Sequence, residues 1–164
     1  MPANFYWEIS NLSPQTITQL GTTGNLMNFQ NADTSNPNTF NTNPVTAGSN
    51  SFEVYLSASI SGSFSAVQNF QFWQNSGSLG PGINILWGDT SNYHVPTTSV
   101  STIATYAIPA SNPGTTNVGI GGNLAGVLTN PGTSDYIVMQ AQTTGSAGPG
   151  ESTAVSFSIS YDEN

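Results

Sequence analysis

The chain has 164 residues, a length at which one domain can bury a core and fold alone. It contains no lysine, arginine or cysteine, and its eight carboxylates give a net charge of −8, with His94 as the only histidine. This composition excludes disulfide bonds and thiolate metal sites, and it argues against binding to nucleic acid, which needs basic side chains.

Neither membrane insertion nor export through a secretory signal is expected. No apolar run approaches the roughly 20 residues of a membrane-spanning helix. The first residues, MPANFYWE, lack the basic and apolar regions of a secretory signal peptide.

Apolar residues that alternate with polar ones predict β-strands from one end of the chain to the other. In chain order, strands are expected over residues 5–10, 52–61, 69–74, 83–87, 100–108, 117–120 and 124–128. A hairpin of two further strands is expected at the end of the chain: the first begins at Asp135, and the second covers residues 155–161. No stretch has the sustained 3.6-residue period of a helix. About eight or nine short strands are typical of an all-β fold, here a single antiparallel β-sandwich over residues 1–164, either immunoglobulin-like or jelly-roll-like.

A long polar segment at about residues 21–50 interrupts this pattern. It is rich in Asn, Thr, Pro and Gly, and it contains Asn-Pro twice, at Asn36 and Asn43. Such residues mark turns and loops. The segment is therefore predicted to be either a surface loop or an arm that reaches a neighbouring subunit.

Catalytic chemistry is not expected. His94 is the only candidate base for a catalytic triad, with Asp89 close in sequence, but no Gly-x-Ser-x-Gly nucleophile motif accompanies them. Both residues lie in a polar stretch that predicts a loop with a solvent-accessible histidine. The acidic residues are scattered, and their spacing marks no pair for glycoside hydrolysis. The sequence therefore favours a protein that is not an enzyme.

Calcium is the one cofactor with some basis in the sequence, because Ca²⁺ prefers oxygen ligands and no basic side chain competes for the carboxylates. The weak candidate ligands are Asp89, in the cluster DTSN, and Asp162 and Glu163, in DEN. Neither cluster matches an EF-hand loop, and solvated loop carboxylates are the simpler explanation. We therefore expect no cofactor, with a bound Ca²⁺ as the alternative.

The three tryptophans, Trp7, Trp73 and Trp87, could form a surface on which sugars stack. In small β-sandwiches, however, aromatic side chains more often belong to the core. Trp73 alternates with Phe70 and Phe72, so it is predicted on the opposite face of its strand, at the surface or in an interface.

Two local motifs have ordinary explanations. Asn11 begins the one N-glycosylation sequon, NLS, which is unremarkable by chance. Tyr136 stands where a tyrosine corner would occur, and a tyrosine that merely starts a strand explains it at least as well.

The strongest functional hint lies in residues 155–161. Apolar side chains alternate there with serine, so one face carries only hydroxyl groups. Soluble β-sandwiches usually protect their edge strands with lysines and other charges, and lysine is missing here. We therefore expect the protein to assemble with copies of itself through sheet edges and polar faces. The interface candidates are Trp73, Ser156, Ser158 and Ser160.

Three stretches resemble small structural proteins of tailed phages and related viruses. The first stretch covers residues 51–77, from SFEVYL to FQFWQNSG. The second covers residues 101–109, beginning with STIAT, and the third covers residues 134–163, from SDYIVMQ to SYDE. All three lie within 51–164. This resemblance implies a capsid decoration or fibre-associated protein with an immunoglobulin-like sandwich, located in the virion. Its partners would be copies of itself, a major capsid protein or another virion protein. The absence of lysine and arginine departs from that group.

Two alternatives stay open. An extracellular filament or pilus subunit at the cell surface would share the high Ser, Thr, Asn and Gly content, but such subunits usually carry a secretion signal. A secreted carbohydrate-binding module is the less favoured alternative. Virions assemble inside the cell and leave by lysis, so the missing signal favours the virion subunit.

Overall fold

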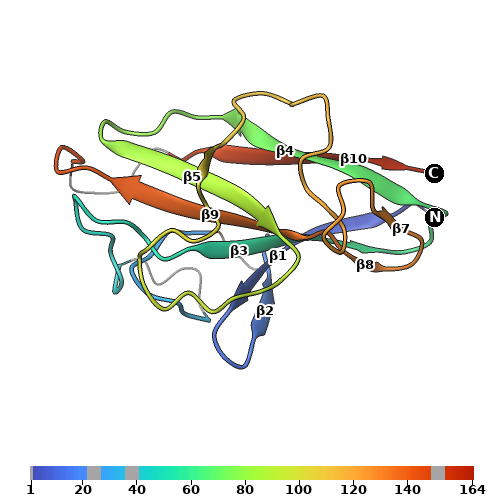
Figure 1. Cartoon of the computed structure of the whole chain (residues 1–164), viewed down its shortest axis with the longest axis horizontal. Helices are drawn as coiled ribbons and strands as arrows, with labels where there is room; N and C mark the ends of the chain where they lie inside the picture. Colours follow the sequence, from blue (N-terminus) through green and yellow to red (C-terminus); the bar gives the residue numbers. More distant parts are fainter. Residues whose placement is uncertain (1, 22–26, 36–40, 149–153) are drawn as a thin grey trace.

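The computed structural model describes residues 2–21, 27–35, 41–148 and 154–164. This part of the chain forms ten β-strands in two antiparallel sheets (Figure 1). It contains no helix, and therefore none that could cross a lipid bilayer. The all-β, sandwich-like architecture predicted from the sequence is confirmed.

The large sheet has the strand order β2-β1-β3-β9-β5-β6, with β8 beside β3, and the small sheet has the order β10-β4-β7. In Figure 1, β4 and β10 run side by side along the long axis of the molecule. The strands are β1 (Asn4–Asn11), β2 (Thr16–Gln19), β3 (Val54–Ser61), β4 (Val67–Ser76), β5 (Ile83–Thr90), β6 (Tyr106–Ala107), β7 (Val127–Leu128), β8 (Gly132–Thr133), β9 (Tyr136–Thr143) and β10 (Ser156–Glu163).

The main core lies between the two sheets, and Phe72 is its aromatic centre. This side chain, on β4, is fully buried. Its ring centroid lies 5.4 Å from that of Trp87 on β5 and 5.7 Å from that of Phe157 on β10. The ring of Trp7 on β1 meets the Phe72 ring edge-on, with 6.4 Å between the two ring centroids. Aromatic pairs at these separations stabilise the core beyond simple burial, so Phe72 links strands of both sheets.

The predicted terminal hairpin is wrong. β9 lies in the large sheet between β3 and β5, whereas β10 pairs with β4 in the small sheet. The connection over residues 144–155 is long enough to cross the roughly 10 Å between packed sheets, so consecutive strands need not pair. Alternation predicts a strand and its faces, but it does not choose the partner strand.

Other predicted strands are much shorter than expected. Within residues 100–108, only the two residues of β6 form a strand. Within 117–120 and 124–128, only the two residues of β7 do so. β2 and β8 were not predicted, because four and two residues carry too little alternation.

The described parts of the polar segment at 21–50 lie on the same domain. Met27 and Phe29 pack against the core, and the N–H of Phe52 donates to the carbonyl of Gln30 at 2.8 Å. These residues therefore form a surface loop held to the sandwich. Residues 22–26 and 36–40, which include the first Asn-Pro pair, lie outside the described part.

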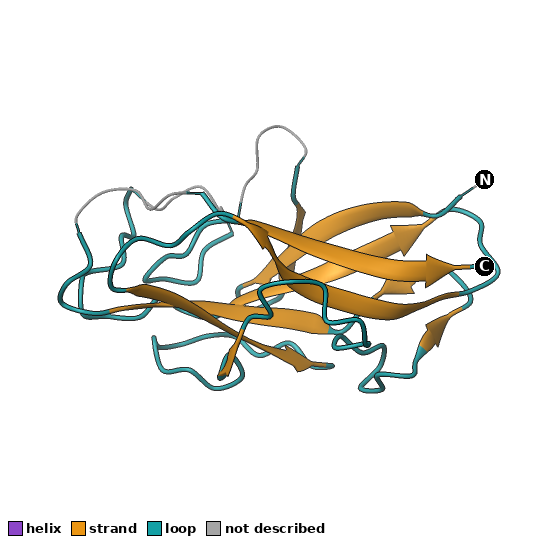
Figure 2. Ribbon diagram, turned by 90° about the horizontal axis from the view of Figure 1, so that it is seen from above, coloured by secondary structure: helices purple, strands orange, loops and turns teal. Residues whose placement is uncertain are grey.

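The two ends of the chain meet at one end of the molecule (Figure 2). The N–H of Ala3 donates to Oε1 of Glu163 at 2.9 Å. The N–H of Asn164 donates to the carbonyl of Ala66 at 2.9 Å, and its carbonyl accepts the N–H of Ser65 at 2.7 Å. The last residue is therefore held by backbone hydrogen bonds next to the start of β4.

Candidate assembly surface and clustered carboxylates

The outer face of the small sheet gathers most of the predicted interface residues. The two phenylalanines of β4 are fully buried, so Gln71 and Trp73 point to the outer side of the strand. The antiparallel register of β4 and β10 places Ser158 opposite Trp73 and Ser160 opposite Gln71. We call these four residues the serine–tryptophan face. All four are half-buried, and none is charged.

Ser156, the fourth candidate, lies at the periphery of this face. It is exposed at the start of β10, opposite Ser76. A register shift between Ser156 and Phe157 separates it from the regular part of the ladder. The structure therefore brings Trp73, Ser158 and Ser160 together and leaves Ser156 at their border.

β10 forms an edge of the small sheet. Among the described residues it pairs only with β4, so a row of its backbone N–H and C=O groups has no strand beside it. The other side of β4 is covered by β7 near its start and by a loop farther along. In this loop the Asn117 side chain accepts the N–H of Phe72 at 2.7 Å and donates to the Phe72 carbonyl at 2.9 Å. The N–H of Gln74 donates to the carbonyl of Pro109 at 2.9 Å. The long open edge of this sheet is therefore that of β10.

The calcium candidates are not brought together. Oδ2 of Asp162 accepts a hydrogen bond from Nδ2 of Asn69 at 2.6 Å, and Glu163 binds the N–H of Ala3. Asp89 lies in β5 of the large sheet. Within the described ranges, no three Asp, Glu, His or Cys side chains gather where they could hold a metal ion.

Asp89 and Asp135 form a carboxylate pair that their spacing in the sequence does not reveal. The register of β5 and β9 places Asp89 opposite Ile137, close to the residue that precedes β9, Asp135. Asp135 is 5% exposed, and its oxygens accept the N–H of Gly122 at 2.9 and 3.2 Å. Oδ1 of Asp89 accepts the N–H of Gly119 at 3.4 Å. Loss of hydration, and then the charge of Asp135, raise the pKa of Asp89 to about 6.

This pair holds the glycine-rich loop over residues 119–122. A Cβ added at Gly119 would collide with Oδ2 of Asp135, so the close approach of loop and carboxylate requires glycine. Paired carboxylates with a raised pKa also occur in catalytic sites. Here Asp135 is buried and binds a loop amide through both oxygens, and we interpret the pair as a loop anchor.

Glu53 is a second anchor, on the outer face of the large sheet. The residue is 5% exposed, and its Oε1 accepts the N–H groups of Thr102, Ile103 and Ala104 at 2.8, 2.7 and 2.8 Å. The hydroxyl of Thr102 donates to the other oxygen, Oε2, at 2.6 Å. Burial alone would raise the pKa of Glu53, but the hydroxyl and the three amides outweigh burial and hold this pKa below its usual value.

The loop held by Glu53 covers a small second core. Tyr55 and Val138 point away from the main core and are buried against Ala104 and Tyr93. The rings of Tyr55 and Tyr93 meet edge-on at 5.1 Å. The outer side of β3 is therefore covered over Glu53, Tyr55 and Ser57, because the chain folds back over it, whereas Ser59 and Ser61 stay partly exposed.

The remaining candidates have ordinary positions. His94 is exposed in the loop over residues 91–105, as expected. Trp7 and Trp87 pack against Phe72 in the core, whereas Trp73 lies on the outer face of β4, so the three tryptophans do not share one sugar-binding surface.

Neither local motif gains a functional role. Asn11 of the sequon is 8% exposed, too buried for a glycan to be attached in the folded protein. The Tyr136 hydroxyl accepts a hydrogen bond from Nε2 of Gln15 at 2.8 Å. A tyrosine corner would instead donate to the backbone a few residues upstream, so Tyr136 is an ordinary strand-start tyrosine.

Comparison of the chain with protein-family models, with curated proteins and with solved structures gives no match. The fold and the site therefore define a class, an all-β protein of two antiparallel sheets in which an open edge strand borders an uncharged face. The resemblance to phage structural proteins stays a prediction.

Proposed function

We propose that the protein is a non-enzymatic structural subunit that assembles with copies of itself. The observation that carries this proposal is the position of β10, whose eight residues form an open edge directly beside the serine–tryptophan face. A new strand can hydrogen-bond to such an edge, while the neighbouring side chains supply specificity.

The chemistry of the face suits burial against a neutral surface. Hydroxyl and amide groups can exchange their hydrogen bonds to water for bonds to a partner, at a much smaller desolvation cost than charges. Trp73 adds the large aromatic side chain that often anchors protein interfaces. Without lysine or arginine, the chain has almost no cationic groups that could form salt bridges with a copy of itself, so an uncharged contact face is the more favourable one.

The acidic end of β10 favours one orientation of the second copy. Asp162 and Glu163 stand at one end of the strand and Ser156 at the other. In a parallel pair, these carboxylates would face their copies across a strand spacing of about 4.8 Å. In an antiparallel pair they would lie roughly 25 Å apart, at ~3.3 Å per residue, where salt screens them. The preferred contact is therefore antiparallel and two-fold symmetric.

The setting that we propose for this subunit is the surface of a virus particle, as a capsid decoration or other virion protein. The resemblance of residues 51–164 to phage structural proteins supports this setting. An extracellular filament built by the same edge is the alternative. Negative-stain microscopy of the native source distinguishes them, since icosahedral particles or tails support the virion and isolated fibrils support the filament.

Sedimentation of the purified full-length chain tests self-assembly. The native chain should form dimers or larger species whose mass rises with concentration. Ser158→Lys, which puts a charge beside Trp73, should lower that mass, whereas Thr97→Lys, on an exposed loop residue, should not. A native chain that stays monomeric at millimolar concentration, or two lysine variants that behave alike, would contradict the proposal.

A further inference from the structure

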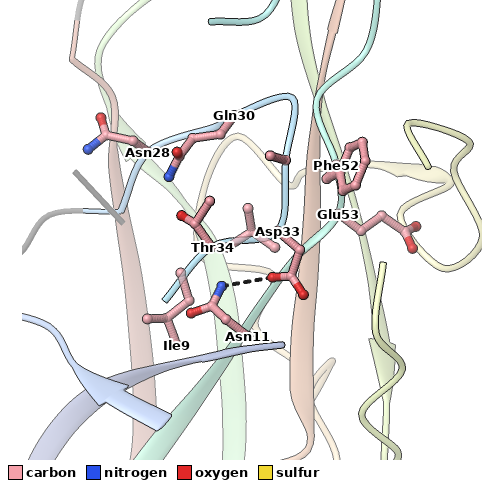
Figure 3. A pocket seen from close by; sticks show the side chains of 10 residues that line it. Ile9, Asn11, Asn28, Gln30, Asp33, Thr34, Phe52 and Glu53 are labelled. Atoms are coloured by element: carbon pink, nitrogen blue, oxygen red, sulfur yellow. Dashed lines mark hydrogen bonds between the residues drawn. The ribbon is translucent and has the colours of Figure 1, made fainter. Parts of the chain in front are cut away.

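A small, partly open cavity of about 10 Å³ lies beneath the polar loop (Figure 3). Its walls come from the end of β1, from residues 28–34 of the loop and from residues 52–54 at the start of β3. The cavity therefore lies where three segments that are distant in the sequence come together.

Asn11, the last residue of β1, lines this cavity with an oxygen that has no protein partner. The residue is 8% exposed, and its Oδ1 is the one buried side-chain polar atom in the described part of the chain that makes no hydrogen bond. Nearly all buried polar atoms of folded proteins are hydrogen-bonded, to protein or to ordered water. We therefore expect this oxygen to accept a hydrogen bond from a donor outside the protein chain.

The orientation of the Asn11 amide follows from its neighbour Asp33. Nδ2 of Asn11 donates to Oδ1 of Asp33 at 3.3 Å, drawn as the dashed line in Figure 3, and the N–H of Leu12 donates to Oδ2 at 2.8 Å. A rotated amide would direct its oxygen at the carboxylate and lose this hydrogen bond. The amide oxygen is therefore kept away from Asp33.

We propose that the cavity binds one ordered water molecule, which donates a hydrogen bond to Oδ1 of Asn11. A volume of roughly 10–15 Å³ accommodates a single water, which needs two to four polar partners. Gln30 and Thr34 line the same cavity, and an amide or a hydroxyl group can take part in more than one hydrogen bond, so each can also contact the water. The water then joins the end of β1 to the loop.

A metal ion fits this cavity less well. Ca²⁺ takes six to eight oxygen ligands, usually including several carboxylates. Asp33 already accepts an N–H donor on each oxygen. Glu53, the other carboxylate residue of the wall, extends its side chain away from the cavity toward the amides of residues 102–104 (Figure 3).

This water has a structural consequence for the segment at 21–50. It adds a contact between the sandwich and residues 28–34, which the hydrogen bond from Phe52 to Gln30 already holds. The described part of the loop is then a fixed element of the subunit and not an arm that reaches a neighbour. This inference is independent of the proposed assembly.

A crystal structure of the full chain, grown without divalent cations and repeated after soaking in terbium chloride, tests the proposal. We expect one peak within hydrogen-bond distance of Oδ1 of Asn11, roughly 2.7–3.2 Å, and no anomalous signal at this position after the soak. An empty cavity, or a terbium peak at that position, would overturn the proposal. In Asn11→Leu, which offers no acceptor, the peak should disappear; a peak that persists would show that Asn11 does not hold the water.

Discussion

The carboxylate of Glu53 accepts the backbone N–H of Ala104 at 2.8 Å across 51 positions of sequence. Together with the adjacent amides of Thr102 and Ile103, this contact fixes the loop over residues 91–105 on the outer face of the large sheet. A single buried carboxylate thus holds the second core closed.

Replacing Glu53 should therefore destabilise the fold. Glu53→Gln keeps the size of the side chain and can leave an oxygen on the three amides, which all point to Oε1, but it removes the negative charge that strengthens these hydrogen bonds. We therefore expect a loss of about 1–2 kcal/mol in the free energy of unfolding. Urea denaturation measures this loss. The control is Glu8→Gln, a half-buried glutamate of β1, which should change stability by less than about 0.5 kcal/mol. Equal effects of the two variants would show that the anchor contributes nothing.

Stability should peak in mildly acidic solution. The pKa of Asp89 rises from 3.8 to about 6 on folding, so its contribution is fully present below 3.8 and is lost as pH increases through about 6. The pKa of Glu53 falls below 4.5, so its contribution is present above 4.5 and is lost as pH decreases through the folded pKa. The two contributions overlap between about pH 4 and pH 5, where most of the Glu53 contribution is present and part of the Asp89 contribution is left.

Melting temperatures from about pH 3 to about pH 8 measure this profile. With no lysine or arginine, acid cannot build up a large positive charge that would unfold the chain. Asp89→Asn removes the titrating group and should abolish the decline between about pH 4 and pH 6. A variant that retains the full decline would assign it to another group.

Gly119 should tolerate no side chain. Gly119→Ala pushes a methyl group into Oδ2 of Asp135, and we expect a destabilisation of about 1–3 kcal/mol as the loop over 119–122 is displaced. Gly148→Ala is the matched control, since a Cβ at that position meets no atom within 4 Å. Thermal unfolding measures both. If the two variants have the same melting temperature, the close contact between Gly119 and Asp135 does not contribute to stability.

The Asn117 side chain should behave as part of the small sheet. Asn117→Ser cannot reach both backbone groups of Phe72, which leaves a buried N–H and C=O without partners and costs about 1–3 kcal/mol. Asn92→Ser, at an exposed loop position, should have little effect. Amide hydrogen exchange at Phe72 is a more local measurement, and its rate should rise only in the Asn117 variant.

Trp73 should matter for association more than for folding. Removing its indole in Trp73→Ala should weaken self-association tenfold or more, equivalent to about 1.4 kcal/mol. Tyr106→Ala, which removes an exposed aromatic ring at the β6 edge of the large sheet, should leave association unchanged. Sedimentation equilibrium gives both constants. If Trp73→Ala associates like the native chain, the serine–tryptophan face is not the contact.

The candidate site was only partly predictable. Alternation placed Trp73 on the outer face of its strand and the three serines on one face of theirs, because side-chain direction in a strand follows from position alone. That Ser158 stands opposite Trp73 depends on the register of β4 and β10, which no local pattern specifies. The pairing of Asp89 with Asp135 was missed for the same reason, since it exists only once β5 lies beside β9.

The sequence by itself determined that this protein is an all-β sandwich without positive side chains, with apolar rows facing inward. Those properties are local or compositional, and each residue carries them wherever its strand is placed. Only the tertiary structure decided that β9 and β10 belong to different sheets, that Glu53 and Asp135 hold loops, and that β10 is an open edge. These features are contacts between distant residues, and they arise from the packing of the whole chain.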